Sequence, residues 1–92
     1  MHDTILLREA IGETIRDLRM QDHRTLREVS ADAQMSLGYL SEIERGQKEA
    51  SSEVLSAIAD ALDVSVGGLM SEVAERMLAY ESDNVVTLRL AA

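Results

Sequence analysis

Apolar residues recur at spacings of three and four along most of the chain, which is the period of an amphipathic helix. The first stripe predicts a helix over 6–21 and consists of Leu7, Ile11, Ile15 and Leu18. Gly12 lies inside this segment and costs a helix about 1 kcal/mol relative to alanine. Two later stripes predict helices that begin after Ser51 or Ser52 and after Ser65, the second continuing to about residue 81.

Two short segments between these stripes carry helix start and stop signals. Thr25 and Glu28 have the spacing of a capping box, which starts the first short helix. Ser36 caps the second, and Gly46 ends it as a glycine in the left-handed conformation does. Two short helices joined by a three-residue turn have the shape of a helix-turn-helix, the alternative being two ordinary amphipathic helices with the same pattern. The apolar residues expected to join them are Val29, Met35, Leu40 and Ile43.

Near the C-terminus the period of the pattern changes. Val86, Leu88 and Leu90 alternate with Thr87 and Arg89, which predicts a strand or extended arm. The chain has no Phe or Trp, so its core consists of aliphatic residues, Met and Ala, which favours closely packed helices over a sandwich. The expected fold class is therefore all-α, with five helices, an extended fifth helix and a short C-terminal extended arm.

The composition argues against several classes of function. The chain has no Cys, and its only imidazoles are His2 and His23, so neither a metal site nor a catalytic triad is supported. There is also no glycine-rich phosphate loop, and no enzymatic activity, cofactor or metal is expected. Because no apolar run approaches a membrane span and the start lacks a signal peptide, we expect a soluble cytoplasmic protein.

The net charge of −8 is concentrated in the second half of the chain. Residues 49–92 carry two bases and eight acids, whereas residues 1–48 carry seven bases and nine acids. The first half is thus close to neutral, and its bases can still line one face toward a polyanion such as double-stranded DNA.

Residues 8–70 resemble the λ-repressor-like family of DNA-binding domains, also called the Cro/C1 or XRE family. The matching stretches are "IRDLRM", "TLREVSADAQMSLGYLSEIERGQKEAS" and "LSAIADALDVSVGGLM", and "GYLSEIERG" is the most specific part. The resemblance implies a DNA-binding domain over 1–70, with its second helix at 26–33 and its recognition helix at 36–45. Leu26 replaces a Gln that often touches phosphate in the family. Gln34 replaces a turn Gly and therefore has to adopt a positive φ.

The resemblance also implies roles for individual residues. The third helix lies in the major groove with its first turn against base edges, where small residues let the backbone approach. Leu37 then meets a thymine methyl or excludes water, or else is a packing residue, and Glu42 either accepts from a cytosine amino group or is a solvated acid. The expected DNA contacts are Arg16, Arg27, Ser36, Leu37, Gly38, Tyr39, Ser41, Glu42, Arg45 and Lys48. In the family, the acid that matches Glu44 forms a structural bridge with the arginine that matches Arg19.

Helix-turn-helix proteins usually bind two half-sites about 34 Å apart, so we expect a homodimer on a palindromic operator. The region 71–92 extends the fifth helix and provides an arm for dimerisation. Four apolar residues exceed what so small a core requires and predict an isologous interface, the alternative being packing against the first helix. These residues are Met70, Val73, Met77 and Tyr80.

The helix-turn-helix more narrowly resembles that of the actinobacterial ClgR family, which activates genes of the Clp protease system. The last residues, Leu90, Ala91 and Ala92, resemble the end of the tag that directs stalled bacterial products to Clp proteases; the alternative is a coincidental apolar tail. The resemblance implies an activator of proteolysis or stress genes, with RNA polymerase and Clp protease as further partners. The alternative function is a protein-binding module, antitoxin-like or an adaptor, that uses the acidic C-terminal helix and arm.

Overall fold

A computed structural model describes residues 5–91 of the chain, with side chains through residue 82. Over this range the chain forms five helices and no strand, which confirms the all-α prediction. The helices are α1 (Leu7–Gln21), α2 (Leu26–Asp32), α3 (Leu37–Glu44), α4 (Ser52–Ala61) and α5 (Val66–Ala91). The predicted bounds 26–33 include the C-cap of α2, Ala33, and the predicted bounds 36–45 include both caps of α3, Ser36 and Arg45.

Hydroxyl side chains cap the last four helices, as the sequence predicted. The Thr25 hydroxyl accepts from the Glu28 amide at 3.0 Å, and that of Ser36 accepts from the Tyr39 amide at 3.1 Å. Ser51, and not Ser52, caps α4 by accepting from the Val54 amide at 3.2 Å. The Ser65 hydroxyl accepts from the Gly68 amide at 2.9 Å. Each cap satisfies an amide that the first turn of a helix leaves without a partner.

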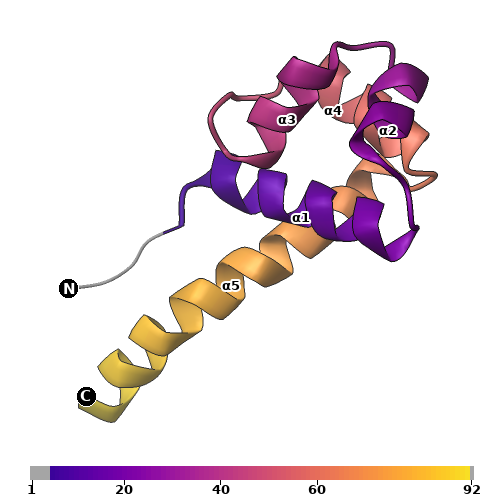
Figure 1. Cartoon of the computed structure of the whole chain (residues 1–92). Helices are drawn as coiled ribbons and strands as arrows, with labels where there is room; N and C mark the ends of the chain where they lie inside the picture. Colours follow the sequence, from indigo (N-terminus) through magenta and orange to yellow (C-terminus); the bar gives the residue numbers. More distant parts are fainter. Residues whose placement is uncertain (1–4, 92) are drawn as a thin grey trace.

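The core lies where α1 meets the other helices, with α2 and α3 on one side of α1 and α5 on the other (Figure 1). Its fully buried side chains come from all five helices and include Ile15, Val29, Leu40, Ile43, Ile58 and Leu69. The predicted stripe of α1 is correct at Ile11 and Ile15 but wrong at Leu7, which is 55% exposed. Leu7 instead lines a shallow surface pocket together with Ala50. Ile5, which lies just before the helix, joins the core.

The last helix is longer than predicted, because α5 continues through Ala91 where an extended arm was expected. No Gly or Pro follows Gly68, and extending an existing helix is easier than starting a new element. A strand also requires a neighbouring strand, and none exists among residues 5–91. Figure 1 shows α5 crossing α1 and running on past the other helices, which gives extents of 50 × 24 × 22 Å.

Within the described residues, no single helix is both long enough and apolar enough to cross a membrane. Only α4 and the first part of α5, Val66–Ser82, taken together across a bend of 100°, have that length and composition.

Candidate nucleic-acid interface

The start of α2 is held by a reciprocal pair of hydrogen bonds. The Thr25 amide donates to the Glu28 carboxylate at 2.8 Å, and the Glu28 amide donates to the Thr25 hydroxyl. The Thr25 amide first, and its side chain second, lower the pKa of Glu28 because they favour the charged carboxylate. The predicted capping box is therefore present, and it fixes the entry into the helix-turn-helix.

The turn between α2 and α3 has the residue with a positive φ that the family resemblance implied. Gln34 adopts a φ of 57°, and its amide donates to the Ala31 carbonyl at 3.1 Å. The Met35 amide reaches back to the Ser30 carbonyl at 2.9 Å. Ser30 itself is only 4% exposed, so its small side chain lets α3 pass close to α2. These bonds set the angle at which α3 leaves the turn.

The outward face of α3 follows from the helical advance of about 100° per residue. Leu40 and Ile43 are buried and define the inner face, so Gly38 and Arg45 lie directly opposite. Ser41 and Glu42 flank them on this outward face. A Cβ atom added at Gly38 would meet nothing within 4 Å, so the centre of this face is open. A large partner can therefore approach the backbone of α3 at its first turn.

A close backbone contact with α1 holds the inner side of α3. A Cβ added at Gly12 would lie 2.4 Å from the Ile43 carbonyl oxygen and 2.6 Å from that of Glu44. Both distances are shorter than real Cβ contacts, so only glycine fits at this crossing. Gly12 weakens α1 as an isolated helix, but it allows the backbones of α1 and α3 to touch. This contact fixes the position of α3 relative to α1.

The predicted bridge between α1 and α3 is present and bidentate. Arg19 donates through Nε to Oε2 of Glu44 at 2.7 Å and through Nη2 to Oε1 at 2.9 Å. The side chains are only 15% and 6% exposed, respectively. The hydrogen bond that Arg19 donates to Glu44 raises the pKa of Arg19, which burial alone would lower. Because both oxygens of Glu44 are engaged, its negative charge is compensated on the side of α3 away from the outward face.

Arg8 is a residue of this region that the sequence did not identify as functional. Its Nε donates to the Gly46 carbonyl at 3.0 Å, which ties the end of α3 to the start of α1. Gly46 has a φ of 72°, as predicted for the helix stop. Arg8, Gly46 and Lys48 line an open pocket of about 520 Å³ beside this end of α3. The contact joins positions 38 residues apart, and no short-range signal in a single sequence reports it.

The structure separates the described bases into two groups. Four arginines stabilise the fold through hydrogen bonds or ion pairs to other helices and loops, and they are Arg8, Arg19, Arg24 and Arg76. The four cations predicted to contact DNA are all exposed, and they are Arg16, Arg27, Arg45 and Lys48. Among the latter, Arg45 makes one long hydrogen bond to Gln47 at 3.3 Å. Described His, Asp and Glu side chains form no group of three that could hold a metal ion.

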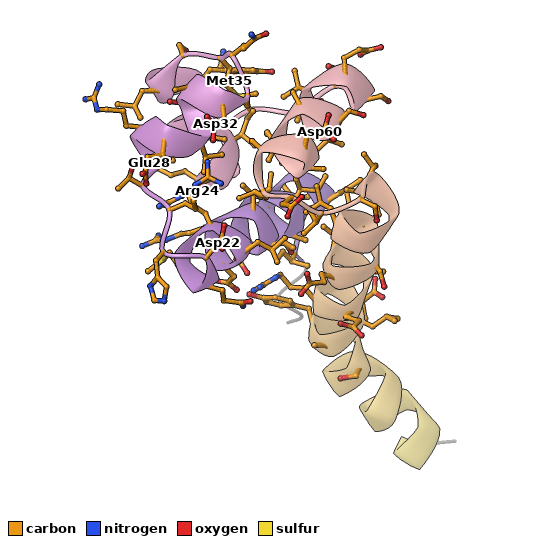
Figure 2. All side chains as sticks on the ribbon, turned by 90° about the vertical axis from the view of Figure 1, so that its right-hand side faces the viewer. Asp22, Arg24, Glu28, Asp32, Met35 and Asp60 are labelled. Carbon is orange, nitrogen blue, oxygen red and sulfur yellow. The ribbon has the colours of Figure 1, made fainter. Side chains whose placement is uncertain are left out.

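Arg24 joins the helix-turn-helix to the rest of the domain. Figure 2 shows its side chain between those of Asp22 and Asp32, and it forms an ion pair with Asp32. Its Nη1 also donates to the Ala61 carbonyl at the end of α4, at 2.8 Å. Its own carbonyl accepts from Arg19 at 3.0 Å, so Arg24 connects α1, α2 and α4. These contacts hold α2 in place relative to the body of the protein.

The predicted dimer residues on α5 do not all reach the surface. Val73 is 2% exposed and belongs to the core, so it has no surface to offer a partner, and the alternative of packing within the chain holds for it. Met70 and Met77 pack partly against the core, whereas Tyr80 is 41% exposed. Leu78, which the prediction omitted, is 61% exposed.

Arg76 holds α5 against α1. Its Nε donates to the buried Thr14 hydroxyl at 3.1 Å, and it forms ion pairs with Glu13 and Asp17. Burial lowers the pKa of Arg76, but its hydrogen bonds to Asp17 and Glu13 and their negative charges raise it by more, so the net shift is upward. Residues 66–80 of α5 are thereby part of the domain, and the remainder of the helix extends beyond it (Figure 1).

Comparison with known proteins agrees with this geometry. The helix-turn-helix family model matches residues 15–69. The transcriptional regulator ClgR of Mycobacterium tuberculosis is 54% identical over 76 residues, which cover 83% of this chain and 68% of that protein. The crystal structure of the clp gene regulator ClgR from Corynebacterium glutamicum superposes with a TM-score of 0.84 at 40% identity, over 96% of this chain and 94% of that one.

A more distant structure shares the fold. The restriction-modification controller protein C.Esp1396I, as a tetramer in complex with its natural 35 base-pair operator, has a TM-score of 0.76 at 20% identity, over 80% of this chain and 97% of that one. The family-model match covers more than half of the chain, and the ClgR match extends over most of it. The chain therefore belongs to the helix-turn-helix family and, within it, to the ClgR transcriptional regulators.

Proposed function

We propose that this chain is a sequence-specific DNA-binding transcription regulator that places α3 in the major groove of its operator. The observation that carries the proposal is the open centre of the outward face of α3 at Gly38. Ser36 caps this end, and the amides of Leu37 and Gly38 precede the first hydrogen bond of the helix. Amides in this position donate to phosphates or base acceptors, and a major groove is wide enough to admit a helix.

The exposed residues around this face supply the remaining contacts. Leu37, at 36% exposure, faces a thymine methyl or excludes water, and Tyr39 and Ser41 border the same turn. Arg16, Arg27, Arg45 and Lys48 contact phosphates. Two copies then neutralise about eight phosphates, so log Kobs should fall with log salt concentration at a slope of about −7.

A homodimer on a palindromic operator is the second part of the proposal. Residues 1–70 carry the helices that bind DNA, and residues 71–92, whose first part also packs against α1, hold two copies at the spacing of two half-sites. Because Val73 is buried, the interface consists of Leu78, Tyr80 and the exposed edges of Met70 and Met77. Leu78→Asp should give a monomer by light scattering and weaken operator binding while leaving the melting temperature of the domain unchanged. A dimeric Leu78→Asp protein would contradict this interface.

We also propose that the operator lies at genes of the Clp protease system and that the protein activates them through RNA polymerase. The support is the identity to proteins named ClgR, one of which is named a clp gene regulator. Transcription from a clp promoter should rise when the protein is added to polymerase in vitro. A fall in transcript would instead identify a repressor.

The C-terminus is proposed as a degradation signal for Clp protease. Leu90 and Ala91 are helical in backbone, but their side chains, like all of Ala92, lie outside the described residues. The support is therefore the sequence of the last three residues alone. Deleting Ala91 and Ala92 should lengthen the half-life of the protein in cells. An unchanged half-life would end this part of the proposal.

Selection of bound sequences from a random duplex pool tests the central proposal. We expect a palindromic consensus whose half-sites are one helical repeat apart. Gly38→Glu is the matched variant, because its side chain enters open space in the free protein and the groove in the complex. It should melt like the parent and retain no duplex. A protein-binding module would enrich no sequence at any salt concentration, and that result would overturn the proposal.

A further inference from the structure

Glu42 presents an uncompensated carboxylate on the outward face of α3. The three other acids within residues 25–45 are engaged: Glu44 with Arg19, Glu28 with Thr25 and Asp32 with Arg24. Within residues 5–82, Glu42 makes no ion pair and no side-chain hydrogen bond. Arg45 lies three residues further along the same face, yet its guanidinium donates to Gln47. The carboxylate of Glu42 therefore belongs to the face that meets the partner of α3, and it has neither an ion pair nor a side-chain hydrogen bond among the described residues.

Such a charge opposes the binding of any duplex unless it gains a hydrogen bond there. Phosphates repel it, and burial in the groove removes its water. Most base edges in the major groove add to the penalty, because guanine N7 and O6 and thymine O4 are all acceptors. Only two groups there donate, the N4 amino group of cytosine and the N6 amino group of adenine. A productive complex thus requires one of these two groups opposite Glu42.

The two amino groups differ in their surroundings. The adenine amino group is flanked by acceptors on both sides, its own N7 and the O4 of the paired thymine. The cytosine amino group has an acceptor on one side only, the O6 of the paired guanine, and a carbon-bound hydrogen on the other. A carboxylate is repelled by neighbouring acceptors, so cytosine is the better partner.

We propose that Glu42 is a specificity-determining residue that requires a cytosine at one fixed position in each half-site. It acts mainly by exclusion, because its charge weakens every complex that lacks the amino group. The inference rests on the proposed function, since it assumes that α3 lies in the major groove. The proposal also explains why an acidic residue lies in the middle of a surface that binds a polyanion.

The test is selection from a random duplex pool by the parent, Glu42→Gln, Glu42→Ala and a control, Glu72→Gln. Glu72 is exposed on α5, so its variant makes the same change in net charge away from α3. The parent and the control should select the same symmetric cytosine and discriminate against other bases by about 10-fold. Glu42→Gln should prefer adenine there, because an amide pairs with both N6 and N7. Glu42→Ala should lose preference at this position alone.

Affinity for a random duplex provides a second readout. Both Glu42 variants should bind it more tightly than the parent, and Glu72→Gln should not. A consensus that is unchanged in Glu42→Gln and Glu42→Ala overturns this inference while leaving the proposed function in place. A parent that enriches no duplex overturns the proposed function itself. Melting curves confirm the fold of each variant, because the Glu42 side chain has no partner to lose.

Discussion

Replacing Gly38 by alanine should make the protein more stable and a poorer DNA binder. Gly38 is the second residue of α3, and glycine costs a helix about 0.5–1 kcal/mol relative to alanine. The added Cβ meets nothing within 4 Å, so no steric cost opposes this gain. For a domain of this length, 1 kcal/mol corresponds to about 4–8 °C in melting temperature. The expected rise is therefore about 2–8 °C.

The same methyl group occupies the point of closest approach to the operator. If the backbone of α3 touches the duplex at this residue, the helix must withdraw, and the contacts on both sides lengthen. We expect a loss of affinity of at least about 10-fold, or 1.4 kcal/mol, per dimer. A variant that loses affinity but gains stability identifies a glycine that is needed for binding. Replacing a glycine that is needed for the fold would instead lower both the stability and the affinity.

Gly67→Ala is a closely matched control. Gly67 is the second residue of α5 and follows a capping serine, as Gly38 does, and its nearest neighbour atom would lie 4.0 Å from an added Cβ. It should gain similar stability and keep the parent's affinity. Thermal melts and fluorescence anisotropy with the duplex selected by the parent measure both quantities. If Gly38→Ala holds this duplex as tightly as Gly67→Ala does, α3 does not approach DNA at its first turn.

Three further outcomes follow from the contacts around α3. Gly12→Ala places a methyl group against two backbone carbonyls and should cost about 3 kcal/mol in a melt, together with operator affinity, because α3 must move. Glu44→Gln leaves the Arg19 charge without its partner and should lower the free energy of unfolding in urea by about 3 kcal/mol. An unchanged urea midpoint would show that the bridge does not stabilise the fold. The pKa of Glu28 is lowered in the folded protein, so the stability that its carboxylate contributes is fully present above pH 4.5 and is lost as the pH falls through the lowered pKa. The difference in melting temperature between the parent and Glu28→Gln should therefore shrink between pH 7 and pH 3. A difference that stays constant over this range would contradict the capping role.

Local chemistry explains why the sequence predicted the helix-turn-helix so closely. A cap needs a hydroxyl at one position and an amide three residues later, and both are visible in a few letters of sequence. The positive φ of Gly46 likewise follows from residues within one turn, whereas that of Gln34 was predicted only through the family resemblance. The Arg19–Glu44 bridge is a long-range contact, and it was found only through the family resemblance.

The errors arise where the outcome depends on other parts of the chain. Gly12 appears in the sequence only as a weakness of α1, because the backbone of α3 that it meets is about 30 residues away. The face of α5 that carries Val73 is apolar whether it packs against α1 or against a second copy, and only the burial of Val73 decides. At the end of the chain, an alternation of five residues is too short to outweigh continuation of a helix already formed.

The distribution of bases explains how a chain with a net charge of −8 can serve as a DNA-binding protein. Arg19, Arg24 and Arg76 neutralise acids of α1, α2 and α3, so these acids contribute little to the field in front of α3. The four exposed cations then act locally, because charges separated by more than a Debye length, about 10 Å at 0.1 M salt, are largely screened from each other. Lowering the salt concentration lengthens that reach and exposes the duplex to the acidic half. Affinity for a random duplex should therefore rise less steeply at low salt than the number of phosphate contacts alone predicts, and a strictly linear salt plot would show that the acidic half plays no part.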